Sequence, residues 1–149
     1  MADLLTSVES EILSGLDPIT RTLAMRHRAA ALAEGLPFLL LSGLRSRSQQ
    51  AALADDPNRA TPAAAPGNSK HEVGAAYDLV RQSSAVESRV GALAEALGLK
   101  WGGRFAPTPD PNHFELPQTR SEIASYRSLA LVGVAAAMGL ALVLAKDRG

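Results

Sequence analysis

In Ser69-Lys70-His71-Glu72-Val73-Gly74-Ala75-Ala76-Tyr77-Asp78, a histidine and an aspartate stand seven residues apart with a glycine between them. A continuous helix would separate His71 and Asp78 by about 10 Å along its axis. A continuous strand would direct the two side chains to opposite faces. They converge only if the chain bends, and Gly74 permits a bend because glycine tolerates conformations that other residues avoid. We therefore predict a loop histidine followed by a strand over 75–80 that presents Asp78.

A second segment, Asp110-Pro111-Asn112-His113-Phe114-Glu115-Leu116, places a histidine at the start of an apolar strand predicted over 113–116. Asp110 precedes that histidine by three residues, across a proline turn. Because the chain has no cysteine, any metal must be held by His, Asp or Glu. Two histidines and one aspartate leave a fourth position for water, which is the composition of a catalytic zinc site. Zinc lowers the pKa of such a water, and Asp110 is the candidate base for its proton.

The rest of the chain predicts an α+β domain, a small antiparallel sheet with flanking helices around the zinc site. Short strands are expected over 38–41, 75–80, 99–105 and 113–116, and helices within the first 14 residues and over 18–34, 49–54 and 84–97. Residues 55–70 form a long loop rich in proline and alanine. The apolar residues of the first two helices are Leu4, Leu5, Val8 and Ile12, then Ile19, Leu23, Met25, Ala30 and Leu32. The third histidine, His27, is expected to be structural or solvated.

The amino-acid composition excludes some classes of function. The 149 residues carry 15 basic and 15 acidic side chains, a formal net charge of zero, which argues against a nucleic-acid binder. The length suits a single domain. The absence of cysteine leaves the compartment open, because such a chain is stable in either redox environment.

Three motifs, in order, resemble the family of zinc D-alanyl-D-alanine carboxypeptidases and dipeptidases, VanY-like enzymes that include the L-alanyl-D-glutamate endopeptidases of phage lysins. The first resembles that family's SGYRS…Q segment, the second its SxHxxGxAxD motif and the third its WGG…DxxHF ending. In this chain they read Ser42-Gly43-Leu44-Arg45-Ser46 with Gln50, then Ser69-x-His71-x-x-Gly74-x-Ala76-x-Asp78, then Trp101-Gly102-Gly103-x-Phe105 with Asp110-x-x-His113-Phe114.

The resemblance implies roles for individual residues. The zinc ligands would be His71, Asp78 and His113, and the general base would be Asp110. Arg45 would donate to the scissile carbonyl and its developing oxyanion. Ser69 and Gln50 would support the ligands or hold the loop without reacting themselves. Trp101 would pack beside the site or in the core. The chain departs from the family pattern at Leu44, where an aromatic is usual, and at Lys70 and Glu72, which flank the first ligand.

The function implied is a zinc metallopeptidase that hydrolyses peptidoglycan stem peptides. Aspartate at position 110, where dipeptidase relatives have glutamate, favours the L-alanyl-D-glutamate endopeptidase. The alternatives are the D-alanyl-D-alanine carboxypeptidase and a non-catalytic, membrane-anchored module that binds the cell wall.

The hydrophobic residues are concentrated in 129–145, LALVGVAAAMGLALVLA. As a helix this run would span about 26 Å, slightly less than the roughly 30 Å of a bilayer's hydrocarbon core. We expect a peptidase domain over 1–127, with its core motifs in 38–116, and an apolar C-terminal helix over 128–146 that contacts a membrane. The alternative is a buried helix or an oligomer interface. The substrate implies a catalytic domain that acts on the cell wall in the periplasm, or a phage virion or lysis protein.

Overall fold

The computed structural model describes residues 5–59, 61–123 and 125. The chain divides into two compact units, Met1–Pro117 and Gln118–Gly149, and the first contains all three sequence motifs. The described residues form an α+β fold, as predicted, in the order α1 (Ser7–Gly15), α2 (Pro18–Ala33), β1 (Leu40–Ser42), α3 (Arg47–Ala54), η1 (Lys70–Val73, a 3-10 helix), β2 (Ala76–Leu79), α4 (Ser84–Ala96), β3 (Lys100–Trp101), η2 (Gly102–Arg104, also 3-10) and β4 (His113–Glu115).

The four strands form one sheet in the order β1-β2-β4-β3, and every neighbouring pair is antiparallel. The register places Tyr77 opposite Phe114 and Asp78 opposite His113. Since successive side chains in a strand point to opposite faces, the aromatic pair and the polar pair lie on different faces of the sheet. The aromatic face forms the core and the other face presents the polar residues.

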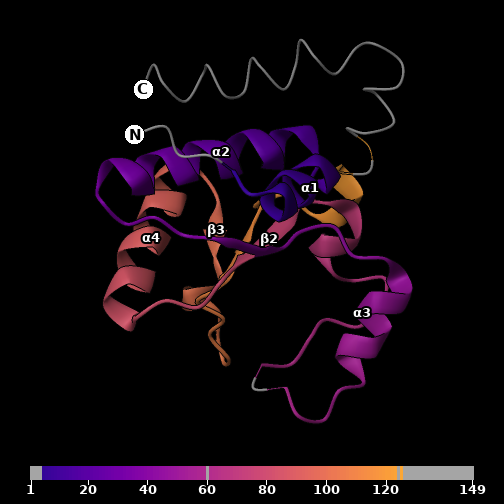
Figure 1. The fold of residues 1–149 in the computed structure, drawn as a ribbon. Coiled ribbons are helices and arrows are strands. Elements are labelled where there is room, and N and C mark those ends of the chain that lie inside the picture. Colours follow the sequence, from indigo (N-terminus) through magenta and orange to yellow (C-terminus); the bar gives the residue numbers. More distant parts are fainter. Residues whose placement is uncertain (1–4, 60, 124, 126–149) are drawn as a thin grey trace. The chain divides into compact units, whose positions relative to one another are not determined.

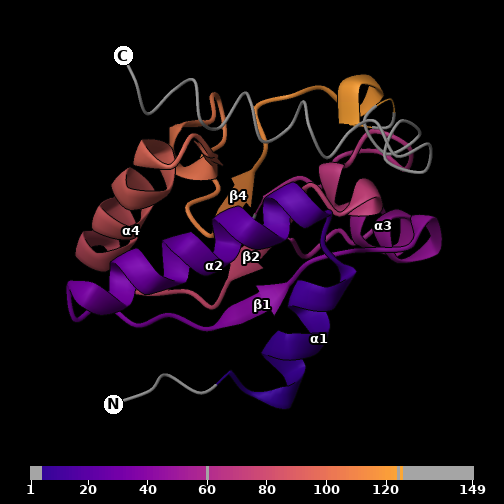
Figure 2. The same cartoon turned by 90° about the horizontal axis from the view of Figure 1, so that it is seen from above.

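The helices α2 and α4 pack against each other on the aromatic face (Figures 1 and 2). Tyr77 and Phe114 stack with ring centroids 5.4 Å apart, and both rings lie close to His27 of α2. His27 is fully buried, with Nδ1 2.8 Å from the Tyr77 hydroxyl and Nε2 2.9 Å from the Val90 carbonyl oxygen. It is a structural histidine of the core.

Among the described residues, the apolar side chains that indicated the first two helices are exposed or only partly buried: Leu5, Val8, Ile12, Ile19, Leu23, Met25, Ala30 and Leu32. Val8 is 61% exposed, whereas Glu9 is buried and accepts hydrogen bonds from Arg28 (2.5 Å) and the Leu40 amide (3.2 Å). A buried carboxylate is tolerated when its oxygens are satisfied in this way. In α2 the buried positions are instead small or polar residues, Thr20, Ala24, His27 and Ala31.

Among the described residues, no helix is long and apolar enough to cross a membrane. The apolar run predicted as a C-terminal helix, 128–146, lies outside the described residues.

Candidate metal centre

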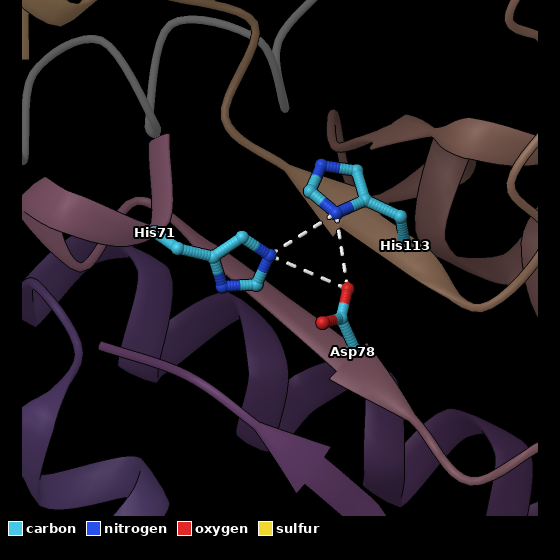
Figure 3. A group of neighbouring side chains, drawn as sticks. All are labelled: His71, Asp78 and His113. Atoms are coloured by element: carbon cyan, nitrogen blue, oxygen red, sulfur yellow. Dashed lines mark hydrogen bonds and ion pairs between the residues drawn. The ribbon is translucent and has the colours of Figure 1, made fainter. Parts of the chain in front are cut away.

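Three side chains from three different elements converge on the polar face of the sheet (Figure 3). His71 comes from η1, Asp78 from β2 and His113 from β4. The Nε2 atom of His71 lies 3.2 Å from Nδ1 of His113 and 3.3 Å from Oδ1 of Asp78. Oδ1 of Asp78 is also 3.0 Å from Nδ1 of His113. The structure thus brings together the three residues predicted as metal ligands.

Local backbone geometry explains the convergence. Gly74 ends η1 in the left-handed conformation, with φ of +68°, and turns the chain from His71 into β2. A Cβ at Gly74 would lie 2.8 Å from the Asp17 amide nitrogen, so glycine is needed for space as well as for φ. Asp78 and His113 are direct cross-strand partners, a position that brings their side chains together on one face. The bend inferred from the sequence is confirmed.

The spacing of the three atoms fits a tetrahedral zinc ion. With ligand bonds of about 2.0–2.1 Å, two ligand atoms of such an ion lie about 3.3 Å apart. The three separations in this structure are 3.0, 3.2 and 3.3 Å. Two imidazole nitrogens and one carboxylate oxygen are also a ligand set that zinc prefers.

The Gly43 carbonyl oxygen orients the first histidine, because it lies 2.7 Å from Nδ1 of His71. A carbonyl oxygen only accepts hydrogen bonds, so Nδ1 carries the proton and Nε2 directs its lone pair at the cluster. Metal-binding histidines typically have such a partner on their second nitrogen. His71 is 2% exposed, and this orientation is therefore well fixed.

The second histidine is oriented by Glu115, a residue to which the sequence analysis gave no role. Oε2 of Glu115 lies 3.1 Å from Nε2 of His113, and its Oε1 accepts from Nζ of Lys70 at 2.9 Å. Residues 113 and 115 point to the same face because they are two apart in a strand. The strand period in the sequence could therefore have indicated that Glu115 lies beside His113.

Arg45 and Ser42 hold the second oxygen of Asp78. Oδ2 accepts from the Ser42 hydroxyl at 2.6 Å and pairs with Nη2 of Arg45, which also donates to Ser42 at 2.7 Å. Burial alone would raise the pKa of Asp78, but its interactions with His113 and His71 lower it well below the ordinary value. Asp78 is therefore an ionised carboxylate, with Oδ1 facing the two histidines and Oδ2 bound by Ser42 and Arg45.

The Asp110 carboxylate is not one of the three converging ligand groups. Within the described part of the chain it forms no side-chain hydrogen bond or ion pair. Its backbone is fixed instead, because the Asp110 amide donates to Gly102 (2.8 Å) and its carbonyl accepts from the His113 amide (3.1 Å). A Cβ at Gly102 would lie 2.3 Å from the Asp110 carbonyl oxygen, which explains a glycine there.

The other predicted site residues, Ser69, Gln50 and Trp101, each have a different structural contact. The Ser69 hydroxyl accepts from the His71 amide at 3.3 Å and caps η1. Gln50 is buried and donates to the Ala64 carbonyl at 2.7 Å, which ties α3 to the long loop. Trp101 lies opposite Phe114 in the sheet, so its side chain is on the helix-covered face. Its Nε1 donates to the Pro111 carbonyl at 2.9 Å and so anchors the turn that contains Asp110.

Comparison with known proteins agrees with this geometry. Residues 63–116 match the sequence model of the D-alanyl-D-alanine carboxypeptidase family. The fold is similar to the L-Ala D-Glu endopeptidase ChiX of Serratia marcescens, with a TM-score of 0.56 and 25% identity over 75% of this chain and 88% of that one. Among the curated proteins, none matches this chain in sequence.

Two further structures share the fold at lower identity. A mutant of the vancomycin resistance D,D-pentapeptidase VanY in complex with Zn(II) has a TM-score of 0.57 at 19% identity, over 69% of this chain and 73% of that one. The LD-carboxypeptidase LdcB has a TM-score of 0.57 at 18% identity, over 77% and 64%. The segment that matches the family model contains His71, Asp78 and His113 in an arrangement that fits a zinc ion, and residues 63–116 are therefore similar to the D-alanyl-D-alanine carboxypeptidase family, whose fold the structure shares with ChiX.

Proposed function

We propose that this zinc metallopeptidase hydrolyses peptidoglycan stem peptides, and that it cuts the L-alanyl-D-glutamate bond as an endopeptidase. The observation that carries the proposal is the three-residue metal centre with Asp110 in the turn that leads directly into His113. The similarity to the Serratia L-Ala D-Glu endopeptidase supports this choice of bond, as does aspartate in place of glutamate at position 110.

Zinc held by His71, Asp78 and His113 would supply Lewis acidity and make water a nucleophile at neutral pH. In the proposed reaction the Asp110 carboxylate accepts the proton of the attacking water and returns it to the leaving amine. The backbone hydrogen bonds of Asp110 to Gly102 and His113 hold this base in a fixed turn.

Arg45 is proposed to serve both the ligand and the substrate. Its Nη2 is engaged with Asp78 and Ser42, and its Nε and Nη1 donate to no other described residue. These two nitrogens are the donors we assign to the scissile carbonyl oxygen and the negative charge that develops on it. Arg45 is 17% exposed, so it reaches the surface where a substrate binds.

The second candidate is a carboxypeptidase that removes the terminal D-alanine. It is favoured by the description of the matched family model and by the fold shared with VanY. Both candidates use the same ligands and base, and they differ only in how the stem peptide lies across the metal centre.

Digestion of purified peptidoglycan by the full chain with zinc distinguishes the endopeptidase from the carboxypeptidase, with fragments identified by mass spectrometry. The endopeptidase is expected to produce fragments with a new N-terminal D-glutamate. A carboxypeptidase would instead release D-alanine. Asp110→Ala should abolish either reaction while zinc stays bound, and Asp56→Ala in the exposed loop serves as the matched control. Zinc binding without cleavage of either bond would refute the enzymatic proposal and leave the cell-wall-binding module.

For residues 129–145 we propose a membrane contact that keeps the catalytic unit next to the cell wall, on the periplasmic side. The support is the apolar composition of this run. Membrane fractions of cells that express the full chain should retain it after carbonate extraction, and Ala137→Asp, which places a charge in the middle of the run, should release it. Equal release of both proteins would contradict the contact.

A further inference from the structure

The Lys70–Glu115 ion pair joins the two segments that carry the histidine ligands. Lys70 precedes His71 in η1, and Glu115 follows His113 by two residues in β4. Nζ of Lys70 lies 2.9 Å from Oε1 of Glu115 and also donates to the Leu116 carbonyl. The two side chains are only 14% and 15% exposed, so this is a largely desolvated pair.

The two oxygens of Glu115 have separate partners, and this division fixes the direction of the carboxylate. Lys70 holds Oε1, which leaves Oε2 directed at Nε2 of His113, 3.1 Å away. A carboxylate only accepts, so Nε2 carries a proton, and Nδ1 is the ring atom that faces Asp78 and His71 and would bind the metal once its own proton has left. The ring of His113 is thereby oriented with Nδ1 directed at the position of the metal.

Backbone contacts make the pair rigid on both sides. The Ala75 amide donates to the Lys70 carbonyl at 3.0 Å, and the Leu116 amide donates to the Ala75 carbonyl at 3.0 Å. Lys70 and the end of β4 are therefore linked through main chain as well as through side chains. A lysine in this position holds the Glu115 carboxylate against rotation as well as neutralising it.

We propose that Glu115 and Lys70 are positioning residues of the zinc centre, with Glu115 orienting His113 and Lys70 locking Glu115 in place. This inference rests on the zinc peptidase assignment but not on the bond that the enzyme cuts. Partners of this kind typically contribute 10- to 100-fold to metal affinity. An ion pair that served only the fold would stabilise the metal-free protein and leave the zinc affinity unchanged.

The test measures zinc dissociation constants of the full chain by competition with a chelator, for the wild type and for Glu115→Ala, Glu115→Gln and Lys70→Met. We expect affinity to fall 10- to 100-fold in Glu115→Ala. Glu115→Gln should retain most of it, because the amide oxygen still accepts from Nε2 of His113. In Lys70→Met the zinc affinity should fall several-fold, since the Glu115 carboxylate remains but no longer has its lysine partner.

Glu34→Ala is the matched control, because Glu34 forms an ion pair with Arg89 (2.5 Å) on the exposed surface. Its zinc affinity should equal that of the wild type. The visible spectrum of the cobalt(II)-substituted protein gives a second readout, which should change in Glu115→Ala and not in Glu34→Ala. Wild-type affinity and spectrum in Glu115→Ala, or equal losses in the alanine and glutamine variants, would overturn the proposal. Peptidoglycan cleavage is not part of this measurement, so a failure of the proposed function would be seen separately.

Discussion

Arg45 pairs with the Oδ2 oxygen of Asp78, while the Oδ1 oxygen of the same carboxylate faces His71 and His113. Ser42 bridges the arginine and the carboxylate, at 2.7 Å and 2.6 Å. Ser42 and Arg45 thus both donate to the Asp78 oxygen that faces away from the two histidines. The arrangement gives Arg45 a role at the metal ligand that is separable from its proposed contact with substrate.

Replacing Ser42 and Arg45 in turn separates these two roles. Ser42→Ala removes one donor to Asp78, so zinc affinity should fall up to about tenfold while kcat at saturating zinc stays close to wild type. Arg45→Ala should weaken zinc binding too, and should also lower kcat at saturating zinc by about 10²- to 10³-fold, because a donor to the developing oxyanion is lost. Wild-type kcat in zinc-saturated Arg45→Ala would show that Arg45 acts on Asp78 alone.

Zinc affinity should depend on pH through His113. Burial lowers the pKa of His113, but hydrogen bonds and the charges of Asp78 and Glu115 raise it more, to about 9. At neutral pH a proton therefore occupies Nδ1 and must leave when zinc binds. Affinity should rise about tenfold per pH unit between pH 6 and 8, with about one proton released, as measured by titration calorimetry in buffers of different ionisation enthalpy. A constant affinity over this range would contradict the prediction.

The convergence of His71 and Asp78 could be predicted from sequence because the constraint on them is local, whereas His113 is assigned from a separate segment and from the family resemblance. His71 and Asp78 converge only around a bend, and glycine between them marks where the bend must be. The partners of the orienting residues could not be predicted in the same way, because the Ser42–Asp78 contact depends on the register of β1 with β2 and the Lys70–Glu115 contact depends on η1 lying next to the end of β4. For Glu115, the strand period predicts only that its side chain lies on the same face as His113. The lysine that departs from the family motif is a partner of Glu115 in the structure.

The helices show a second limit of prediction from sequence. Their positions followed from the periodicity of apolar residues, but the buried face of α1 contains Glu9, which no hydrophobic pattern predicts. That face is determined by Arg28 and the edge of β1, both remote in sequence.

Gly74 and Gly35 form a matched pair for testing the bend. Both have φ near +70°, but a Cβ at Gly35 would meet nothing within 4 Å, whereas at Gly74 it would meet backbone atoms of the segment before α2. Gly35→Ala should cost about 1–2 kcal/mol of unfolding free energy from backbone strain alone. Gly74→Ala should cost clearly more and should also weaken zinc binding, because it displaces η1 and His71. Denaturant unfolding of the metal-free proteins measures the difference, and equal costs would contradict the steric argument.

The stability of the metal-free protein should fall on mild acidification because of His27. Burial lowers the pKa of His27 to about 4, from about 6.5 in the unfolded chain. Between these values the unfolded state binds the proton and the folded state does not, so stability is present above pH 6.5 and is lost as pH falls toward 4. The loss expected from this one side chain is on the order of 3 kcal/mol.

His27→Gln isolates this contribution from that of the carboxylates, which titrate in both proteins. The variant should be less stable at pH 7, because the hydrogen bonds to Tyr77 and Val90 and the ring packing are altered. Since glutamine does not titrate, however, the difference in unfolding free energy between the two proteins should become smaller as pH falls from 6.5 to 4. Unfolding free energies at pH 7, 5.5 and 4.5 measure that difference. A difference that stays constant would mean that His27 is protonated as readily in the folded protein as in the unfolded chain, which its burial opposes even though the Val90 carbonyl accepts from Nε2 and favours the proton.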